Sequence, residues 1–201
     1  SYYTDAGQAG IPVDCRKAFT RSVDGASVSI PANALYEPIF YTQNTEEPQT
    51  KGPVNRYSPV YKIHDDRIPL HSAITVSIDA PLAPQDLRSK LCLAKVSDDG
   101  TKYSYIAGKY DNGRVTGTTR TFGRYTVVAD NTAPTITPSF TDSADLRGKP
   151  SMAFTLRDDF SGVASFSATI DGKWIPFEQQ RGVVTYHFND SRFDFKGTTH
   201  N

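Results

Sequence analysis

Short alternations of apolar and polar residues, separated by turn-forming residues, recur along the whole chain. The clearest is Ile-Thr-Val-Ser-Ile-Asp at 74–79, which places three β-branched apolar side chains on one face of a strand. Asp-Gly at 99–100 and Asn-Gly at 112–113 predict tight hairpins. Turn signals about every ten residues are typical of an antiparallel sandwich. The other strands predicted in this series span 26–30, 39–42, 60–64, 91–96, 103–106, 114–116 and 123–128.

A second series of strands follows the polar segment 130–134, whose Ala-Pro step favours an extended chain. Its predicted strands span 136–140, 151–156, 163–170, 173–175 and 183–188, with a tight turn at Asp171-Gly172. We therefore predict an all-β chain of two tandem antiparallel β-sandwiches. The predicted parts are a leading segment or linker (1–22), a first sandwich (23–129), a linker (130–134) and an Ig-like sandwich (135–201).

The second segment is short for an Ig-like sandwich, which needs about seven strands and roughly 100 residues. We therefore expect it to lack its last strand. In that case 183–188 would form an unpaired edge that could template pairing with another chain.

Charge and hydropathy exclude several classes of protein. Lys plus Arg and Asp plus Glu both number 22, so the formal net charge is zero. Nucleic-acid binding through a basic face and polybasic membrane anchoring both require an excess of positive charge. No apolar run approaches the roughly 18–20 residues of a membrane-spanning helix. The first residues, from Ser1 to Asp5, do not resemble a signal peptide, although an exported chain loses such a segment on maturation.

Few residues suggest chemistry. Cys15 and Cys92 are far apart in sequence and form either one long-range disulfide or two buried thiols. The four histidines show no zinc-binding spacing. His64, Asp65 and His71 could together hold a metal ion, but solvent-facing residues at a strand end are the preferred explanation. Asp158–Gly162 lacks the order of an EF-hand loop and suggests a turn. We predict no catalytic, cofactor-binding or metal-binding residue in this chain.

Aromatic residues are the remaining candidates for binding. Trp174, Tyr103 and Tyr105 could form a flat platform on which a sugar ring stacks. Alternating tyrosines also commonly pack across strands and cover a sheet face. Both alternatives stay open.

Four segments of the first series, in order, resemble a ZU5-like β-sandwich. They are Ser-Ile-Pro-Ala-Asn-Ala-Leu (29–35), Ser-Pro-Val-Tyr (58–61), Ile-Thr-Val-Ser-Ile (74–78) and Phe-Gly-Arg-Tyr (122–125). In the second series, 130–136, 158–163 and 170–174 resemble a bacterial Ig-like repeat. The tandem is similar to the C-terminal region of exported M23-family (lysostaphin/LytM-like) zinc metallopeptidases of Gram-negative bacteria.

In that family, an upstream domain cuts peptidoglycan cross-links with a zinc ion held by H-x-x-x-D and H-x-H motifs. Neither motif occurs here, so the resemblance assigns no catalytic role to this chain and places zinc only in an upstream domain. It implies an accessory region in the periplasm or at the cell surface. Such a region would act as a spacer, dock onto the catalytic domain or contact peptidoglycan. The alternative is a cell-surface adhesion or glycan-binding module.

Overall fold

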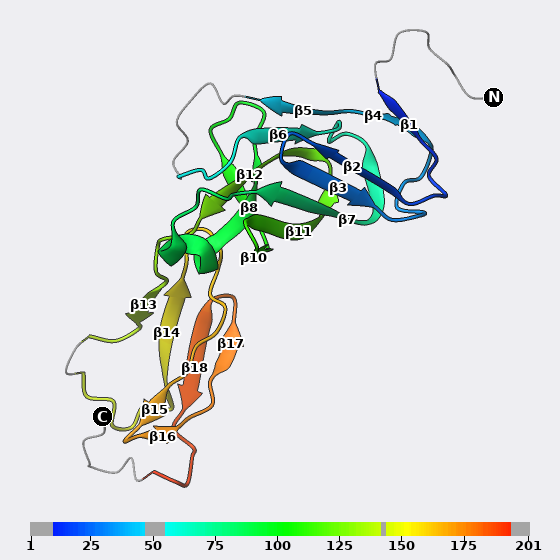
Figure 1. Cartoon of the computed structure of the whole chain (residues 1–201). Coiled ribbons are helices and arrows are strands. Elements are labelled where there is room, and N and C mark those ends of the chain that lie inside the picture. The colour runs from blue at the N-terminus through cyan, green and yellow to red at the C-terminus, as the bar shows by residue number, and fades with distance from the viewer. Residues whose placement is uncertain (1–9, 47–54, 142–143, 194–201) are drawn as a thin grey trace. The chain divides into compact units, whose positions relative to one another are not determined.

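Two units, residues 1–131 and 132–201, make up the chain in the computed structural model (Figure 1). The structure describes residues 10–46, 55–141 and 144–193. Almost all regular structure in these residues is β-strand, which confirms the predicted all-β class. The helix η1 (Gln85–Lys90) is a short 3₁₀ segment, and in the described part of the chain no helix is long and apolar enough to cross a bilayer.

The first unit contains two five-stranded antiparallel sheets, called sheet 1 and sheet 2. Sheet 1 has the order β10–β11–β7–β3–β2, and sheet 2 has the order β5–β6–β12–β8–β9. The strands of sheet 1 are β2 (Phe19–Val23), β3 (Ala26–Ile30), β7 (Pro69–Asp79), β10 (Gly108–Asp111) and β11 (Arg114–Thr121). The strands of sheet 2 are β5 (Gln43–Glu46), β6 (Val60–Ile63), β8 (Leu91–Val96), β9 (Tyr103–Ile106) and β12 (Gly123–Ala129).

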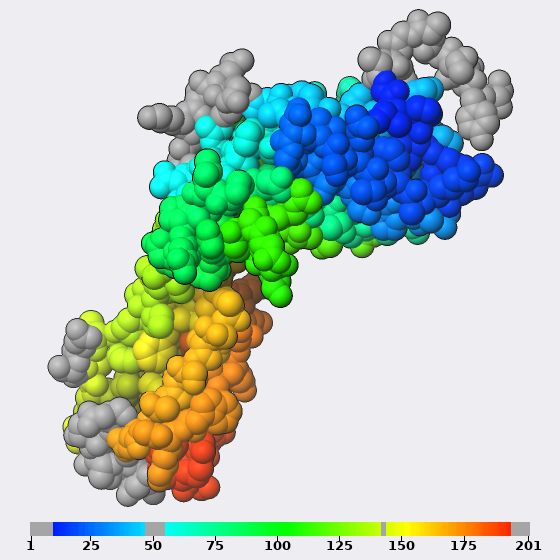
Figure 2. Space-filling model, viewed as in Figure 1, coloured from blue at the N-terminus to red at the C-terminus, as the bar shows by residue number. Residues whose placement is uncertain are grey.

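The two sheets share one apolar core. In β7, Ile74, Val76 and Ile78 are completely buried, as the alternation at 74–79 predicts. Tyr125 and Val127 of β12 fill the core from sheet 2. The opposite face of sheet 1 carries serine and threonine hydroxyls, such as the pairs Thr20–Ser29 and Ser77–Thr116, and β2 and β3 lie within the blue region of Figure 2.

In addition to the two large sheets, β1 (Ile11–Val13) and β4 (Ile39–Tyr41) pair as a separate two-stranded antiparallel sheet. β1 leads toward β2, and β4 is separated from β5 by Thr42 alone. The described part of the leading segment 1–22 therefore contributes β1 and most of the edge strand β2 to the first unit.

The chain passes from one sheet to the other between β9 and β10, which are separated only by Ala107. Glycine is required around this crossing. A Cβ at Gly117 would lie 2.1 Å from the carbonyl oxygen of Ala107, and a Cβ at Gly108 would lie 2.9 Å from Val115 Cγ1. Both distances are far inside van der Waals contact, so no side chain fits at these two positions.

The second unit has a four-stranded antiparallel sheet of order β13–β14–β18–β17 and a separate hairpin, β15–β16. Phe177 lies against the sheet, with its ring centroid 6.0 Å from that of Phe154 and 5.9 Å from that of Tyr186. Ile170 and Ile175, from the hairpin region, complete the buried cluster with Tyr186. The strands are β13 (Thr135–Pro138), β14 (Ser151–Arg157), β15 (Thr169–Ile170), β16 (Lys173–Trp174), β17 (Glu178–Gln180) and β18 (Val183–His187).

Two expectations for this unit are wrong. The predicted edge at 183–188 is an internal strand, because β18 pairs with β14 on one side and with β17 on the other. The hairpin turn Arg181-Gly182, with φ angles of 49° and 79°, connects β17 to β18 and lets the two strands pair. The predicted strand 163–170 is limited to Thr169–Ile170, and residues 162–168 have no regular structure.

Candidate functional site

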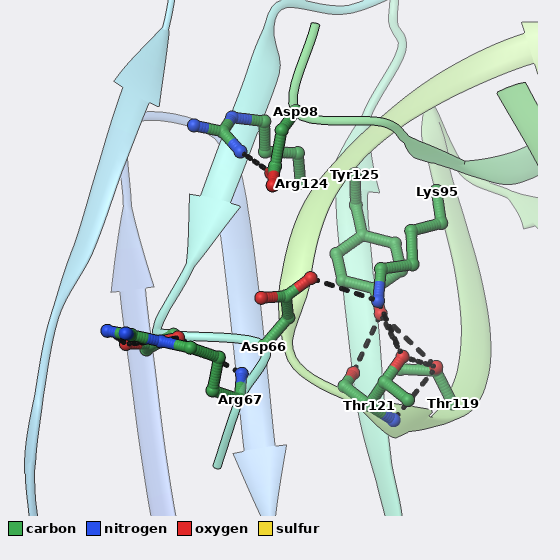
Figure 3. A network of polar contacts seen from close by, with 9 residues as sticks. Asp66, Arg67, Lys95, Asp98, Thr119, Thr121, Arg124 and Tyr125 are labelled. Atoms are coloured by element: carbon green, nitrogen blue, oxygen red, sulfur yellow. Dashed lines mark hydrogen bonds and ion pairs between the residues drawn. The ribbon is translucent and has the colours of Figure 1, made fainter. Parts of the chain in front are cut away.

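A network of polar contacts lies where β6 ends and β12 begins (Figure 3). We call its central residues, Asp66, Lys95, Thr119, Thr121 and Tyr125, the end cluster. Asp66 lies in the turn after β6, Lys95 in β8, the two threonines near the end of β11, and Tyr125 in β12. The cluster therefore joins residues of both sheets.

The hydroxyl of Tyr125 is the hub of the end cluster. It donates to the carbonyl oxygen of Thr121 (2.7 Å) and lies 3.2 Å from Thr119 Oγ1 and 3.1 Å from Thr121 Oγ1. Tyr125 is completely buried, and burial raises the pKa of its hydroxyl. The hydroxyl thus stays protonated and acts as a fixed hydrogen-bond donor.

Lys95 extends this network toward solvent. Its Nζ donates to Thr121 Oγ1 (3.3 Å) and lies 3.7 Å from Asp66 Oδ2. A Cβ at Gly123, where φ is +137°, would lie 2.7 Å from Lys95 Cε. Glycine at the start of β12 therefore leaves the path that the lysine side chain occupies.

Arg124 forms a second ionic group beside the cluster. Its Nε donates to Glu46 Oε2 of β5 (2.7 Å), and its Nη1 donates to Asp98 in the β8–β9 turn. The guanidinium thus ties the edge strand β5 and the β8–β9 turn to β12. Side-chain exposures of 23% for Arg124 and 30% for Glu46 make this a partly shielded pair.

The turn that carries Asp66 is fixed by a carboxylate–guanidinium pair. Asp65 accepts hydrogen bonds from the side chain and the backbone N–H of Arg67, and these bonds hold the pKa of the Asp65 carboxyl well below its usual range. A carboxylate with a lowered pKa is a weak proton acceptor at neutral pH. The Asp65–Arg67 pair is therefore suited to fixing this turn rather than to proton transfer.

His64, expected to face solvent, is buried instead, with 9% of its surface exposed. Its backbone has a positive φ of 54°, which turns the ring inward at the end of β6. The ring stands perpendicular to that of Phe122 at 5.1 Å between centroids, and it packs near Tyr41. Burial lowers the pKa of the imidazole.

The structure does not assemble the metal site considered for His64, Asp65 and His71. His71 is exposed and packs edge-on against Tyr36, at 5.4 Å between centroids. No group of three or more His, Cys, Asp or Glu side chains within the described residues is placed to hold a metal ion.

The three aromatic candidates for sugar binding lie in different surroundings. Trp174 is 59% exposed in β16 of the second unit, and Tyr105 is 39% exposed in β9 of the first. Tyr103 lies on the same face of β9, but its hydroxyl is buried without a hydrogen-bond partner. Their neighbours on β8 are Val96 beside Tyr103 and Ala94 beside Tyr105, both buried. Tyr103 thus packs as a covering residue, whereas Trp174 presents an accessible ring.

Cys15 and Cys92 are both free thiols. Cys92 is buried in β8, and burial raises its pKa to about 12. Cys15 is partly buried beside the core of the first unit.

The family model of the Zu5-like domain matches residues 12–130. This chain belongs to the Zu5-like domain family. The matched region runs from β1 to the end of β12, so the Zu5-like domain comprises both sheets of the first unit and the end cluster. The predicted ZU5-like sandwich is confirmed. No curated protein matches the chain.

The sequence did not point to the end cluster, and it predicted that His64 faces solvent rather than being buried. One signal for the cluster is present in the segment 119–125, Thr-Arg-Thr-Phe-Gly-Arg-Tyr. A glycine inside a strand pattern marks a bulge or a close approach of the chain. Gly123 marks such a close approach, because a Cβ at this position would lie 2.7 Å from Lys95 Cε.

Proposed function

We propose that this chain is a non-catalytic accessory region of an exported cell-wall (peptidoglycan) peptidase of a Gram-negative bacterium. It acts in the periplasm or at the cell surface as a spacer, docking or wall-contact region. The observation that carries the proposal is the order of domains, a Zu5-like domain at 12–130 followed by a second β unit. This order agrees with the resemblance of both series of motifs to the region that follows an M23-family catalytic domain.

The polar residues of the Zu5-like domain support an accessory role. Arg124 is shared between Glu46 and Asp98, Lys95 lies beside Asp66, and Asp65 is held by Arg67. These pairs stabilise strand ends and turns. In the proposal, the zinc ion and its ligands belong to an upstream catalytic domain.

Co-sedimentation with intact peptidoglycan sacculi tests this function. The purified chain is mixed with sacculi, and the supernatant is assayed for released muropeptides. We expect binding without release if the region contacts the wall, and neither binding nor release if it acts as a spacer or docks onto the catalytic domain. Release of muropeptides by this chain alone would overturn the proposal.

A glycan-binding module is the second candidate, and the exposure of Trp174 favours it. An exposed indole ring offers a flat apolar surface on which a sugar can stack. On a glycan array, Trp174→Ala should abolish any signal and Trp174→Phe should retain part of it. Tyr103→Ala is not a suitable control because its hydroxyl is buried, so Tyr36→Ala, at another exposed aromatic residue, serves instead. A blank array with the unaltered chain would reject this candidate.

A further inference from the structure

His64 and Thr42 are held together by contacts of both backbone and side chain. The backbone N–H of His64 donates to the carbonyl oxygen of Thr42 (2.9 Å). In return, the backbone N–H of Thr42 donates to Nδ1 of the His64 ring (3.4 Å). Thr42 is the single residue between β4 and β5, so this clasp fixes the point where the chain enters edge strand β5.

The direction of these hydrogen bonds defines the protonation state of the ring. Nδ1 accepts a hydrogen bond from Thr42, so the proton of the neutral imidazole resides on Nε2. Nε2 is buried and has no hydrogen-bond partner. The clasp therefore requires the neutral ring.

A second proton would convert Nδ1 from an acceptor into a donor that faces the N–H of Thr42. The Thr42 hydroxyl lies 3.4 Å from Nδ1 and could accept this proton, but within the described residues the Nε2 proton would still lack an acceptor. A buried charge without sufficient hydrogen bonds is costly. Protonation of His64 is therefore favoured only when the ring leaves its buried position beside Thr42.

The charged and titratable groups around the ring do not compensate for such a charge. On its own turn, the negative Asp65 favours protonation, but this carboxylate is already paired with Arg67. From β4, Tyr41 faces the ring and directs its hydroxyl to Gln43 Oε1 (2.8 Å). The residue that packs from the start of β12 is the uncharged Phe122.

We propose that the His64–Thr42 clasp is an acid-operated latch, which releases the start of β5 from sheet 2 when His64 is protonated. Release uncovers the neighbouring backbone of β6, on which β5 normally pairs. The opening is local, because the ion pair between Glu46 and Arg124 holds the other end of β5. This device is independent of the cell-wall role proposed above.

The size of the effect follows from proton linkage. A histidine that is neutral when latched and free to titrate when open binds one more proton in the open form below its ordinary pKa of about 6.5. Each further pH unit then favours the open form by up to about tenfold. Acidification from pH 7 to pH 5 should therefore shift the latch equilibrium by up to about twentyfold, above the range in which ordinary carboxylates titrate.

Amide hydrogen exchange of the full chain at pH 7 and pH 5 tests the latch, with protection factors corrected for the intrinsic exchange rate. Protection of the β5 amides should fall severalfold, and by up to about twentyfold, at pH 5 in the unaltered chain. His64→Asn is the matched variant, since its amide oxygen replaces the Nδ1 acceptor, does not titrate, and asparagine tolerates a positive φ. This variant should lose the pH dependence, whereas His71→Asn, at an exposed histidine, should keep it.

Nitrogen NMR of the His64 ring in the unaltered chain is a second test that needs no variant. We expect the tautomer with the proton on Nε2 at pH 7, and protonation of His64 below the ordinary histidine pKa of about 6.5. The latch is rejected if the proton resides on Nδ1. It is also rejected if His64 titrates at the ordinary histidine pKa of about 6.5 without loss of β5 protection, or if His64→Asn retains the full pH dependence.

Discussion

The hydroxyl of Tyr125 donates a 2.7 Å hydrogen bond to the carbonyl oxygen of Thr121, four residues earlier in the chain. Thr121 ends β11 in sheet 1, and Tyr125 belongs to β12 in sheet 2. The bond therefore braces the short connection by which the chain passes between the two layers of the sandwich.

Removal of this hydroxyl should destabilise the first unit. In Tyr125→Phe, the carbonyl of Thr121 loses its side-chain donor, at a cost of about 0.5–1.5 kcal/mol in the free energy of unfolding. Urea unfolding followed by circular dichroism measures the change. Tyr36→Phe is the control, because Tyr36 is 67% exposed, and it should alter stability by less than about 0.5 kcal/mol. Equal effects of the two substitutions would contradict the bracing role.

Gly117 should not tolerate any side chain. A Cβ at this position would lie 2.1 Å from the Ala107 carbonyl oxygen, so the backbone of the β9–β10 crossing would have to move. We expect Gly117→Ala to cost about 1–3 kcal/mol or more in unfolding free energy. Thermal unfolding checks this value. Thr118→Ala, at the exposed neighbouring position, should remain close to the unaltered chain.

The thiols should differ sharply in reactivity. Cys92 is buried with its pKa raised to about 12, so almost none of it is the reactive thiolate at neutral pH. Iodoacetamide should therefore add one label, at Cys15, to the native chain and two labels to the unfolded chain, as measured by mass spectrometry. If the unfolded chain takes up no label until a reductant is added, the two cysteines form a disulfide.

The loss of folding stability at acid pH should depend on turns in which an arginine donates hydrogen bonds to an aspartate. In the second unit, the side chain and backbone of Arg192 donate hydrogen bonds to Asp190 and lower its carboxyl pKa from 3.8 to about 2. Because the folded pKa is lowered, the stabilisation is complete above pH 3.8 and is lost as the pH falls through about 2.

Carbon NMR titration of the carboxylates can measure this shift. The pKa of Asp190 should rise toward its ordinary value in Arg192→Gln, because that substitution removes the guanidinium donors. Arg181→Gln, in the hairpin turn before β18, should leave Asp190 unchanged. An unchanged pKa of Asp190 in Arg192→Gln would show that the pair does not act as described.

The apolar–polar alternation was sufficient to predict most strands of the first unit, because one side of each alternating segment faces the shared core. It failed for His64, because a positive φ at the strand end turns a polar residue inward. It also missed β17, whose turn into β18 uses Arg181-Gly182 rather than the Asn-Gly or Asp-Gly pairs that mark such turns most clearly. The end cluster joins residues from β8, β11 and β12, and single-strand patterns do not reveal such long-range contacts.

The passage of the chain through Ala107 has a mechanical consequence for the sandwich. At the margin formed by β9 and β10, the two layers are joined covalently by a single residue and cannot separate there. The short crossing from β11 to β12 also lies away from the opposite margin, where β2 and β5 are the outer strands, so the layers separate most easily there. The β1–β4 ladder joins the segment before β2 to the segment before β5. Its hydrogen bonds therefore hold the β2 and β5 margin of the two layers together. Under a mechanical force that pulls the two sheets apart, the hydrogen bonds of the β1–β4 ladder should break first, and separation should then proceed toward β9 and β10.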